Sequence, residues 1–268
     1  MKFLTTIPII SGLYLFMITP RIFKKPDRTP FFGVHYAHRG LFDNNSDAPE
    51  NSLPAFQKAV DAGYGIELDV QLSKDKKLVV FHDATLKRMC GVTGNVWDYT
   101  LEELKQFKLA SSNETIPTFE EALSVINRKV PFILEFKLDV VQTEVCELAN
   151  EVLKNYKGTY CIESFHPFAL MWYKKNRPDV LRGQLSEEFF RQEKYKRKPV
   201  LMLVSYLLTN CVTRPDFIAY NHKHANNISR RICRHLGALS VTYTVKSKAE
   251  YERAKNKFDL FIFDSFQL

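Results

Sequence analysis

Two β-rich runs of this sequence carry acidic residues whose side chains would share one face. Glu67 and Asp69 are two positions apart in the run IELDVQ, and alternate side chains of a strand point to the same side. Glu135 lies in a second run, FILEF, with Lys137 two positions beyond it. Three carboxylates form an all-oxygen site that suits Mg²⁺ or Ca²⁺ and not zinc, because a cation relieves their mutual repulsion. We therefore predict that Glu67, Asp69 and Glu135 bind one divalent cation; the alternative is that each acid pairs with a local lysine or arginine.

Two histidines and two cationic side chains are predicted to complete this cluster. His38 ends the first β-rich run and is followed by Arg39, while His82 ends another run. Imidazoles beside a divalent cation are typical of a general acid and base that work near neutral pH. Arg39 is suited to bidentate binding of a phosphate oxygen, and Lys137 adds a second positive charge. Together these side chains predict the cleavage of a phosphate ester.

A hairpin is predicted to bring His82 to the acidic residues. The runs LDVQLS and LVVFH are separated by four residues, KDKK, which are too few for a helical crossover between parallel strands. Pairing about this turn would place Asp69 opposite His82 and Val70 opposite Phe81. The extra strand would therefore return a histidine to the end of the second strand.

The elements around these residues predict a (β/α)₈ TIM barrel with a hairpin after the second strand. Eight β-rich runs alternate with stretches whose apolar residues recur at helical spacing. Capping boxes at Thr100-x-x-Glu103 and Thr118-x-x-Glu121 mark two helix starts. Parallel strands joined by helices favour a barrel, and the doubly wound alternative lacks its glycine-rich phosphate turn. The expected strands are Val34–Ala37, Ile66–Gln71, Phe132–Phe136, Tyr160–Ser164, Leu181–Leu185, Phe217–Tyr220, Leu239–Val245 and Leu260–Phe263.

The composition argues against nucleic acid as a partner. The net charge is +8, but residues 1–32 hold five basic residues against Asp27, so half of the charge lies in that segment. No DNA- or RNA-binding motif accompanies the remainder. Five cysteines without a CxxC pair also argue against a disulfide framework or a structural zinc site.

The N-terminal segment is predicted to be a membrane anchor. Phe3–Pro20 is a run of 18 residues without a charge, bracketed by Lys2 and Arg21. As a helix it would be about 27 Å long, enough for a thin hydrocarbon core. A cleaved signal peptide would need a small-x-small cleavage pattern, which is missing; the other alternative is a buried core element. We expect one transmembrane helix in residues 1–20, with the lipid bilayer as a partner.

The segments that follow complete the expected domain organisation. Residues 21–32 would form a basic linker and residues 33–268 the catalytic domain. The positive-inside rule favours a cytoplasmic catalytic domain, because four basic residues follow the anchor: Arg21, Lys24, Lys25 and Arg28. A second basic cluster, residues 191–198, precedes the apolar run 199–208. It suits either contact with anionic lipid or a solvated turn before an ordinary barrel helix.

The order of these motifs resembles the glycerophosphodiester phosphodiesterase family. The matching segments are AHRG (37–40), PENS (49–52), IELDVQLSKDKKLVVFHD (66–83), IPTFEEAL (116–123), LEFK (134–137), SF (164–165) and YTV (243–245). The resemblance implies metal-dependent hydrolysis of glycerophosphodiesters to glycerol 3-phosphate and an alcohol. It also implies His38 and His82 as the acid–base pair and Glu67, Asp69 and Glu135 as ligands of the cation.

The resemblance implies further roles in substrate binding. Arg39 and Lys137 would contact the phosphate. Asn51 in the PENS turn would shape the phosphate pocket, or else it caps the helix that begins at Leu53. Tyr243 stands where the family usually has tryptophan, so the ring on the glycerol side of the pocket would be smaller.

Two other functions remain open. A lysophospholipase D would act on membrane lysophospholipids through the same site, and the expected anchor favours it. A membrane-tethered barrel that binds phosphodiesters without turnover is the non-enzymatic alternative. The presence of all three acids and both histidines argues against the second.

Overall fold

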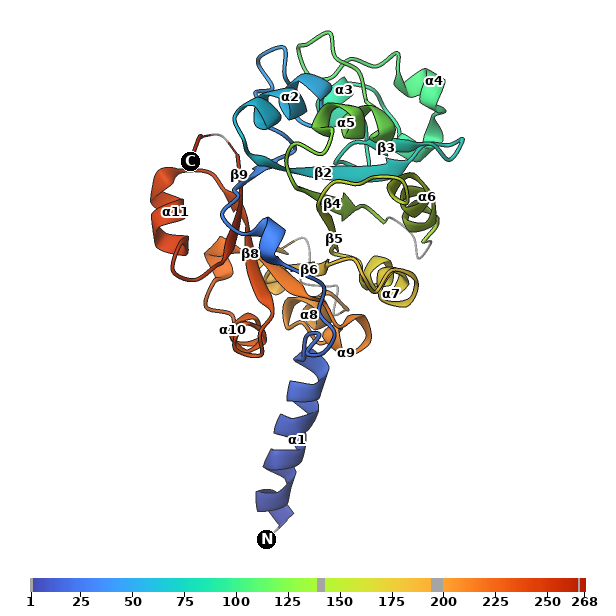
Figure 1. Cartoon of the computed structure of the whole chain (residues 1–268). Helices are drawn as coiled ribbons and strands as arrows, with labels where there is room; N and C mark the ends of the chain where they lie inside the picture. Colours follow the sequence, from blue (N-terminus) through green and yellow to red (C-terminus); the bar gives the residue numbers. More distant parts are fainter. Residues whose placement is uncertain (1, 139–142, 194–199, 265) are drawn as a thin grey trace.

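A closed parallel barrel forms the body of the molecule (Figure 1). The computed structural model describes residues 2–138, 143–193, 200–264 and 266–268, so most of the second basic cluster lies outside the described residues. Within them, eight parallel strands close through the pairing of β1 with β2, and β3 is added antiparallel to β2. The strands are β1 Tyr36–His38, β2 Gly65–Leu72, β3 Leu78–Val80, β4 Phe132–Phe136, β5 Tyr160–Ser164, β6 Arg182–Ser186, β7 Phe217–Asn221, β8 Leu239–Val245 and β9 Leu260–Phe263.

Helical segments cover the outside of this barrel. The predicted capping boxes at Thr100 and Thr118 are confirmed, and each begins a helix. The α-helices are α1 Lys2–Ile18, α2 Leu53–Asp61, α3 Lys87–Cys90, α4 Leu101–Leu104, α5 Phe119–Ile126, α6 Glu144–Leu153, α7 Pro167–Asn176, α8 Val200–Ser205, α9 Asn210–Thr213, α10 Ile228–His235 and α11 Lys248–Ala254. The 3₁₀ turns are η1 Thr29–Phe31, η2 Val96–Asp98, η3 Phe189–Arg191 and η5 His222–His224.

Alternation along the strands divides the apolar residues between two cores. In β4, Phe132 and Leu134 pack in the layer between sheet and helices, whereas Ile133 packs inside the barrel. In β2, Ile66 and Leu68 likewise belong to the outer layer. The polar residues between them must therefore face the barrel interior.

A third apolar cluster supports the segment that carries His82. It is built by the region from β3 to the turn before α5, including Val79, Phe81 and Leu86, all at most 2% exposed. Its burial anchors the chain on both sides of the histidine.

The predicted hairpin exists, but its predicted register is wrong by one residue. Val70 pairs with Val80, and not with Phe81, and Leu72 with Leu78 is the last pair before the turn. Ser73 belongs to the turn, where its amide donates to the carbonyl of Lys77 at 3.0 Å. The connection is therefore five residues long, and Asp69 lies opposite Phe81, whose amide donates to its carbonyl at 3.1 Å.

The prediction of a single-pass N-terminal anchor is also wrong. Among the described residues, no helix is long and apolar enough to cross a membrane. The helix α1 has 17 residues and ends at Ile18, short of the predicted Pro20. At 1.5 Å per residue it is about 26 Å long, against about 30 Å of hydrocarbon. The expected bilayer partner and the cytoplasmic placement derived from the anchor are withdrawn with it.

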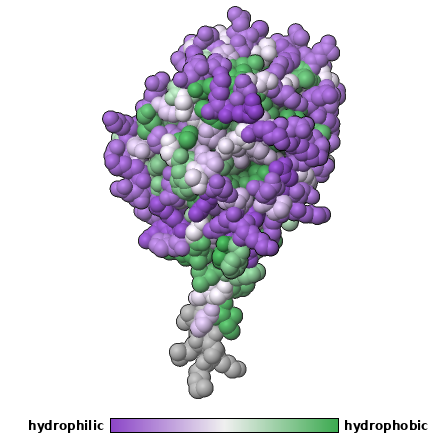
Figure 2. All heavy atoms as spheres, viewed as in Figure 1, coloured by the Kyte–Doolittle hydropathy of each residue, from purple (hydrophilic) through white to green (hydrophobic). Residues whose placement is uncertain are grey.

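The last turn of α1 is held by the barrel domain. Ile18 is fully buried, and its carbonyl accepts a hydrogen bond from Asn210 Nδ2 at 2.8 Å. Arg214 Nη1 donates to the carbonyl of Phe16 at 3.0 Å, and Tyr14 Oη lies 2.8 Å from Ser229 Oγ. The preceding turns extend away from the body (Figure 1), and their exposed large side chains, Ile9, Ile10 and Leu13, are apolar (Figure 2). Part of the apolar run thus serves to attach the helix.

Candidate active site

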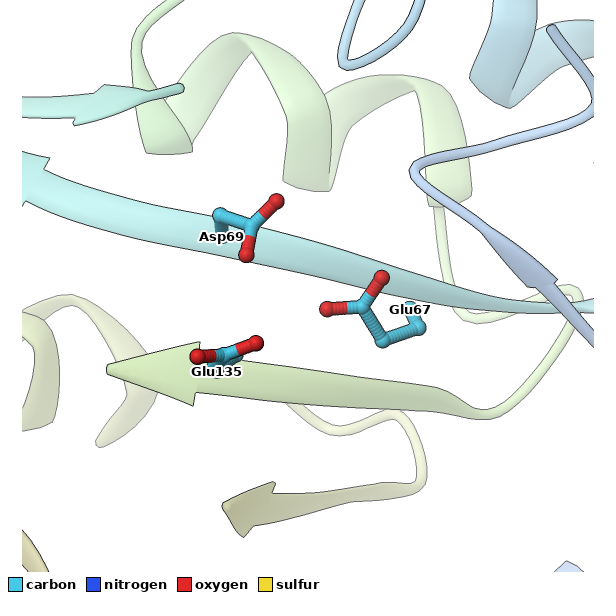
Figure 3. A group of neighbouring side chains, drawn as sticks. All are labelled: Glu67, Asp69 and Glu135. Atoms are coloured by element: carbon cyan, nitrogen blue, oxygen red, sulfur yellow. The ribbon is translucent and has the colours of Figure 1, made fainter. Parts of the chain in front are cut away.

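Three carboxylates converge between the neighbouring strands β2 and β4. Glu67 and Asp69 come from β2 and Glu135 from β4, where Asp69 and Glu135 are direct neighbours in the parallel register. Each offers an oxygen that lies within 4.8 Å of the others (Figure 3). All three residues are at most 6% exposed. The predicted juxtaposition of the acids is therefore confirmed.

Lys137 is the nearest cation to these acids. Its Nζ lies 3.0 Å from Asp69 Oδ1 and 2.5 Å from Glu135 Oε1. Although burial acts in the opposite direction, the charge of Lys137 holds the pKa of Asp69 well below its usual range. Burial, followed by the charges of Asp69 and Glu135, raises the pKa of Glu67 well above the usual range. Lys137 thus forms ion pairs with two of the acids, whereas the negative charge of Glu67 is poorly compensated.

The donor set fits a divalent cation. Glu67 Oε1 is buried and has no hydrogen-bond partner among the described residues. Carboxylate oxygens are hard ligands, as Mg²⁺ and Ca²⁺ require, and a cation there would offset the negative charge that a single lysine leaves. Glu67, Asp69 and Glu135 are the residues that could hold such an ion.

Arg39 and Asn51 border the acids on the β1 side. Arg39 has a left-handed backbone (φ 57°), and its amide donates to Glu67 Oε2 at 3.1 Å. Its Nη1 donates to Glu50 Oε1 at 2.6 Å. Asn51 Nδ2 donates to Asp69 Oδ2 at 2.9 Å, and the cap of α2 is Ser52. The capping alternative for Asn51 is therefore wrong, and Asn51 orients a carboxylate of the site.

His38 is held by a carboxylate that sequence reasoning missed. Its Nδ1 lies 3.0 Å from Asp264 Oδ2, just beyond β9, and its Nε2 lies 3.9 Å from Glu67 Oε2. A carboxylate only accepts, so Nδ1 carries the proton and Nε2 presents its lone pair to the acidic cluster. Burial, then the charge of Arg39, lowers the pKa of His38 to about 4. Asp264 directly follows the last predicted strand, and an acidic residue at that position could have been recognised in the sequence as a candidate for the site.

His82 has an equivalent arrangement. Its Nδ1 lies 2.6 Å from Asp83 Oδ1, so Nε2 is the nitrogen that Asp83 leaves available. Arg88 Nε donates to Asp83 Oδ2 at 2.6 Å, and the same guanidinium donates to both oxygens of Glu50 at 2.7 Å. Since Glu50 also binds Arg39, a continuous network links the two sides of the site. Neither Asp83, Glu50 nor Arg88 was predicted.

A pocket of about 160 Å³ unites these groups. His38, Arg39, Glu67, His82 and Glu135 line one part of it. Phe165, Leu185, Tyr243 and Ile262 line another part, together with Glu163, an acid that sequence reasoning did not single out. Tyr243 thus lies at the pocket, and its Oη donates to the carbonyl of Ser186 at 2.8 Å.

A family model supports the same reading of the chain. The model described as the Glycerophosphoryl diester phosphodiesterase family matches residues 38–257. A glycerophosphodiester phosphodiesterase from Bacillus altitudinis is 34% identical over 169 residues, which cover 59% of this chain and 68% of that protein. A lysophospholipase D from Rattus norvegicus is 29% identical over 157 residues, covering 54% of this chain and 48% of that protein. The matches span about two thirds or less of these curated relatives.

One solved structure aligns with this chain over nearly the whole length of the solved protein. The phosphodiesterase from Oleispira antarctica, determined with the product sn-glycerol-3-phosphate, superimposes with a TM-score of 0.70. The two chains are 26% identical, and the alignment covers 88% of this chain and 94% of the other. The barrel and the order of its strands are therefore shared with an enzyme of known product.

Proposed function

This chain belongs to the glycerophosphoryl diester phosphodiesterase family, a group of phosphoric diester hydrolases, and we propose that residues 33–268 hydrolyse glycerophosphodiesters to glycerol 3-phosphate and an alcohol. The observation that carries the proposal is one pocket lined by both histidines, Arg39 and two acids, Glu67 and Glu135, whose oxygens cluster with that of Asp69. A carboxylate cluster, two imidazoles and a guanidinium suit a phosphodiester that must be bound, attacked and released.

Glu67, Asp69 and Glu135 would hold one divalent cation, Mg²⁺ or Ca²⁺. Such an ion, when bound, would offset phosphate charge and lower the pKa of a hydroxyl group beside it. Arg39 and Lys137 would bind phosphate oxygens. Because Arg39 is anchored by Glu50 and Lys137 by Glu135, both cations are supported from behind.

His38 would take the proton from the attacking hydroxyl, and His82 would give a proton to the leaving alcohol. Each ring donates through Nδ1 to a carboxylate, Asp264 or Asp83, so each uses Nε2 for the transfer. The nucleophile is either water or the 2-hydroxyl of the substrate. Trapping distinguishes the two routes, since only attack by the 2-hydroxyl forms a cyclic phosphate.

The experiment is an assay of the full chain with Mg²⁺ or Ca²⁺ on glycerophosphocholine, with glycerol 3-phosphate and choline measured together. Equal release of both products supports the proposal. If the protein binds the diester without turnover, the non-enzymatic alternative replaces it.

Lysophospholipase D activity through the same site is the second candidate. The relative from Rattus norvegicus favours it. Comparing glycerophosphocholine with lysophosphatidylcholine at matched concentrations decides between them. Faster cleavage of the lysolipid would favour the second candidate.

A further inference from the structure

Glu163 is a buried acid that the proposed chemistry leaves without a role. It lies on β5, opposite Glu135 of β4 in the parallel register, and its residue is 1% exposed. It lines the same pocket as His38 and Glu67. Its Oε2 is fully buried and has no hydrogen-bond partner among the described residues. Burying an unpartnered carboxyl oxygen is costly, so a ligand at this position would gain from satisfying it.

The cation site does not account for Glu163. The group of acids whose oxygens lie within 4.8 Å of one another contains Glu67, Asp69 and Glu135, and Glu163 falls outside it. In the part of the chain that the structure describes, Lys137 pairs with Asp69 and Glu135, and no ion pair forms with Glu163. Glu163 therefore lies beside the predicted cation ligands without belonging to their cluster.

The surroundings of Glu163 suit a short, partly polar ligand. Phe165 and Tyr243 meet edge to face with ring centroids 5.9 Å apart, and Leu185 and Ile262 add aliphatic surface. The hydroxyl of Tyr243 already donates to the carbonyl of Ser186. Glu163 is thus the acidic acceptor on an otherwise mostly apolar wall. A pocket of about 160 Å³ is well below the 300–1,000 Å³ typical of drug-sized ligands, so it suits a three-carbon unit and not an acyl chain.

We propose that Glu163 hydrogen-bonds the terminal hydroxyl of the glycerol unit and selects phosphodiesters in which that hydroxyl is free. The inference rests on the proposed function and specifies its substrate. With the phosphate held by Arg39 and Lys137, the terminal hydroxyl is the glycerol oxygen farthest from the phosphate. Because Arg39 and Glu163 line the same pocket, a glycerol unit that extends from the phosphate into this pocket would bring its terminal hydroxyl to the wall that contains Glu163. An acyl group on this oxygen would remove the donor and overfill the pocket.

The test measures whether substitution of Glu163 removes the preference in kcat/KM for a substrate that has the terminal hydroxyl. One substrate is glycerophosphocholine; the other is its analogue with the terminal hydroxyl replaced by hydrogen, which keeps the 2-hydroxyl. We expect wild-type kcat/KM to be about 10- to 100-fold higher for glycerophosphocholine, the cost of leaving a buried polar group without its hydrogen-bond partner. In Glu163→Leu, which keeps the side-chain bulk, the two substrates should be cleaved with similar kcat/KM. Glu163→Gln should keep part of the preference, because its amide still accepts and donates.

Cys161→Ala is the matched control. Cys161 lies two residues earlier on β5, packs inside the barrel below the pocket and does not line it. We expect this variant to keep the wild-type ratio between the two substrates even where it lowers stability. Equal losses on both substrates in Glu163→Leu, or no preference in the wild type, would overturn the inference. If Glu163→Leu does not fold, the wild-type ratio and Glu163→Gln still decide. Absence of any turnover by the wild type refutes the proposed function instead.

Discussion

At the scale of single residues, the site is defined by which imidazole nitrogen each histidine presents. Asp264 accepts a hydrogen bond from Nδ1 of His38, and Asp83 accepts one from Nδ1 of His82. Both rings therefore direct Nε2 away from their carboxylate partner. Paired in this way, each ring keeps one tautomer and one orientation. The acid and base roles then differ only in where the substrate's nucleophile and leaving group lie.

We predict that an activated leaving group distinguishes the two histidines. Loss of a general acid or base lowers kcat by about 10²- to 10⁴-fold. His82→Ala should show this loss with a choline leaving group and recover with p-nitrophenol, which leaves without protonation. His38→Ala should remain slow with both substrates.

The control for this comparison is His235→Ala. His235 lies on α10 and is exposed, and its Nδ1 lies 2.8 Å from the carbonyl oxygen of Arg231 in its own helix. It should leave both rates unchanged. Recovery of His38→Ala in place of His82→Ala would reverse the assigned roles.

The acid limb of the pH profile should lie unusually low for a histidine. Burial and Arg39 lower the pKa of His38 to about 4, so the neutral base persists as the pH falls below 6.5. We expect kcat/KM to hold to about pH 5 and to fall toward pH 4. An acid limb near pH 6.5 in folded protein would contradict this expectation.

Folding must be followed in the same pH series. The unfolded chain takes up its proton on His38 near pH 6.5 and the folded chain only near 4. The stability linked to neutral His38 is therefore present above pH 6.5 and is lost as the pH falls toward 4. Circular dichroism at each pH separates loss of fold from protonation of the base.

At this scale, the sequence predicted the groups that alternate on one strand or follow a strand end. Glu67 and Asp69 share a face because they are two apart, and Glu135 meets them through the neighbouring strand. Asp264 was missed because it lies 226 residues from His38 and meets it only when the barrel closes. Glu163 carried a usable signal, since it alternates with inward-facing Cys161 on β5.

At the scale of elements, the hairpin decides where His82 lies. Its existence followed from a connection too short for a helix, but its register depended on whether Ser73 belonged to the strand or to the turn. The hydroxyl of Ser73 accepts from the amide of Lys77 at 2.9 Å and donates to Asp75 Oδ1 at 2.7 Å. These local hydrogen bonds draw Ser73 into the turn, which composition alone does not reveal.

Gln71 is predicted to position the segment around His82. Its Nε2 donates to the carbonyls of Phe81 and Asp83, both at 2.7 Å, and so brackets the histidine. Gln71→Leu should lower kcat by about 10-fold and the free energy of unfolding by about 1–3 kcal/mol, because two carbonyls lose their donor. Steady-state kinetics and urea unfolding measure the two effects.

Lys74→Ala provides the comparison for Gln71. Lys74 is an exposed residue in the turn of the same hairpin, so kcat and stability should stay near the wild-type values. A normal kcat in folded Gln71→Leu would show that the position of His82 does not depend on the two hydrogen bonds from Gln71.

At the scale of the whole molecule, the barrel was predictable and the role of α1 was not. The strand order follows from regular alternation of β-rich and helical segments. Its length and lack of charge favoured a membrane anchor for the apolar N-terminal run. Neither property shows that the last turn of this helix is buried against the barrel. Contacts with Asn210 and Arg214, about 190 residues away, hold that turn.

The docking of α1 is tested by two isoleucines. Ile18 is fully buried, and Ile10 is 64% exposed on the same helix. Ile18→Ala should lower the free energy of unfolding by about 2–5 kcal/mol, as for other buried aliphatic residues. Ile10→Ala should change it by less than about 0.5 kcal/mol. Equal effects in denaturant unfolding would mean that the last turn is not docked.

The central claim is that Glu67, Asp69 and Glu135 act through a divalent cation on a phosphodiester. The most direct measurement is release of glycerol 3-phosphate from glycerophosphocholine after chelation, followed by addition of Mg²⁺ or Ca²⁺ to the wild type and to Asp69→Asn. We predict that chelation abolishes turnover, that one of the two ions restores it in the wild type, and that Asp69→Asn stays at least about 100-fold slower at the same ion concentration. Full activity in the presence of chelator, or equal recovery of folded Asp69→Asn, would contradict the account.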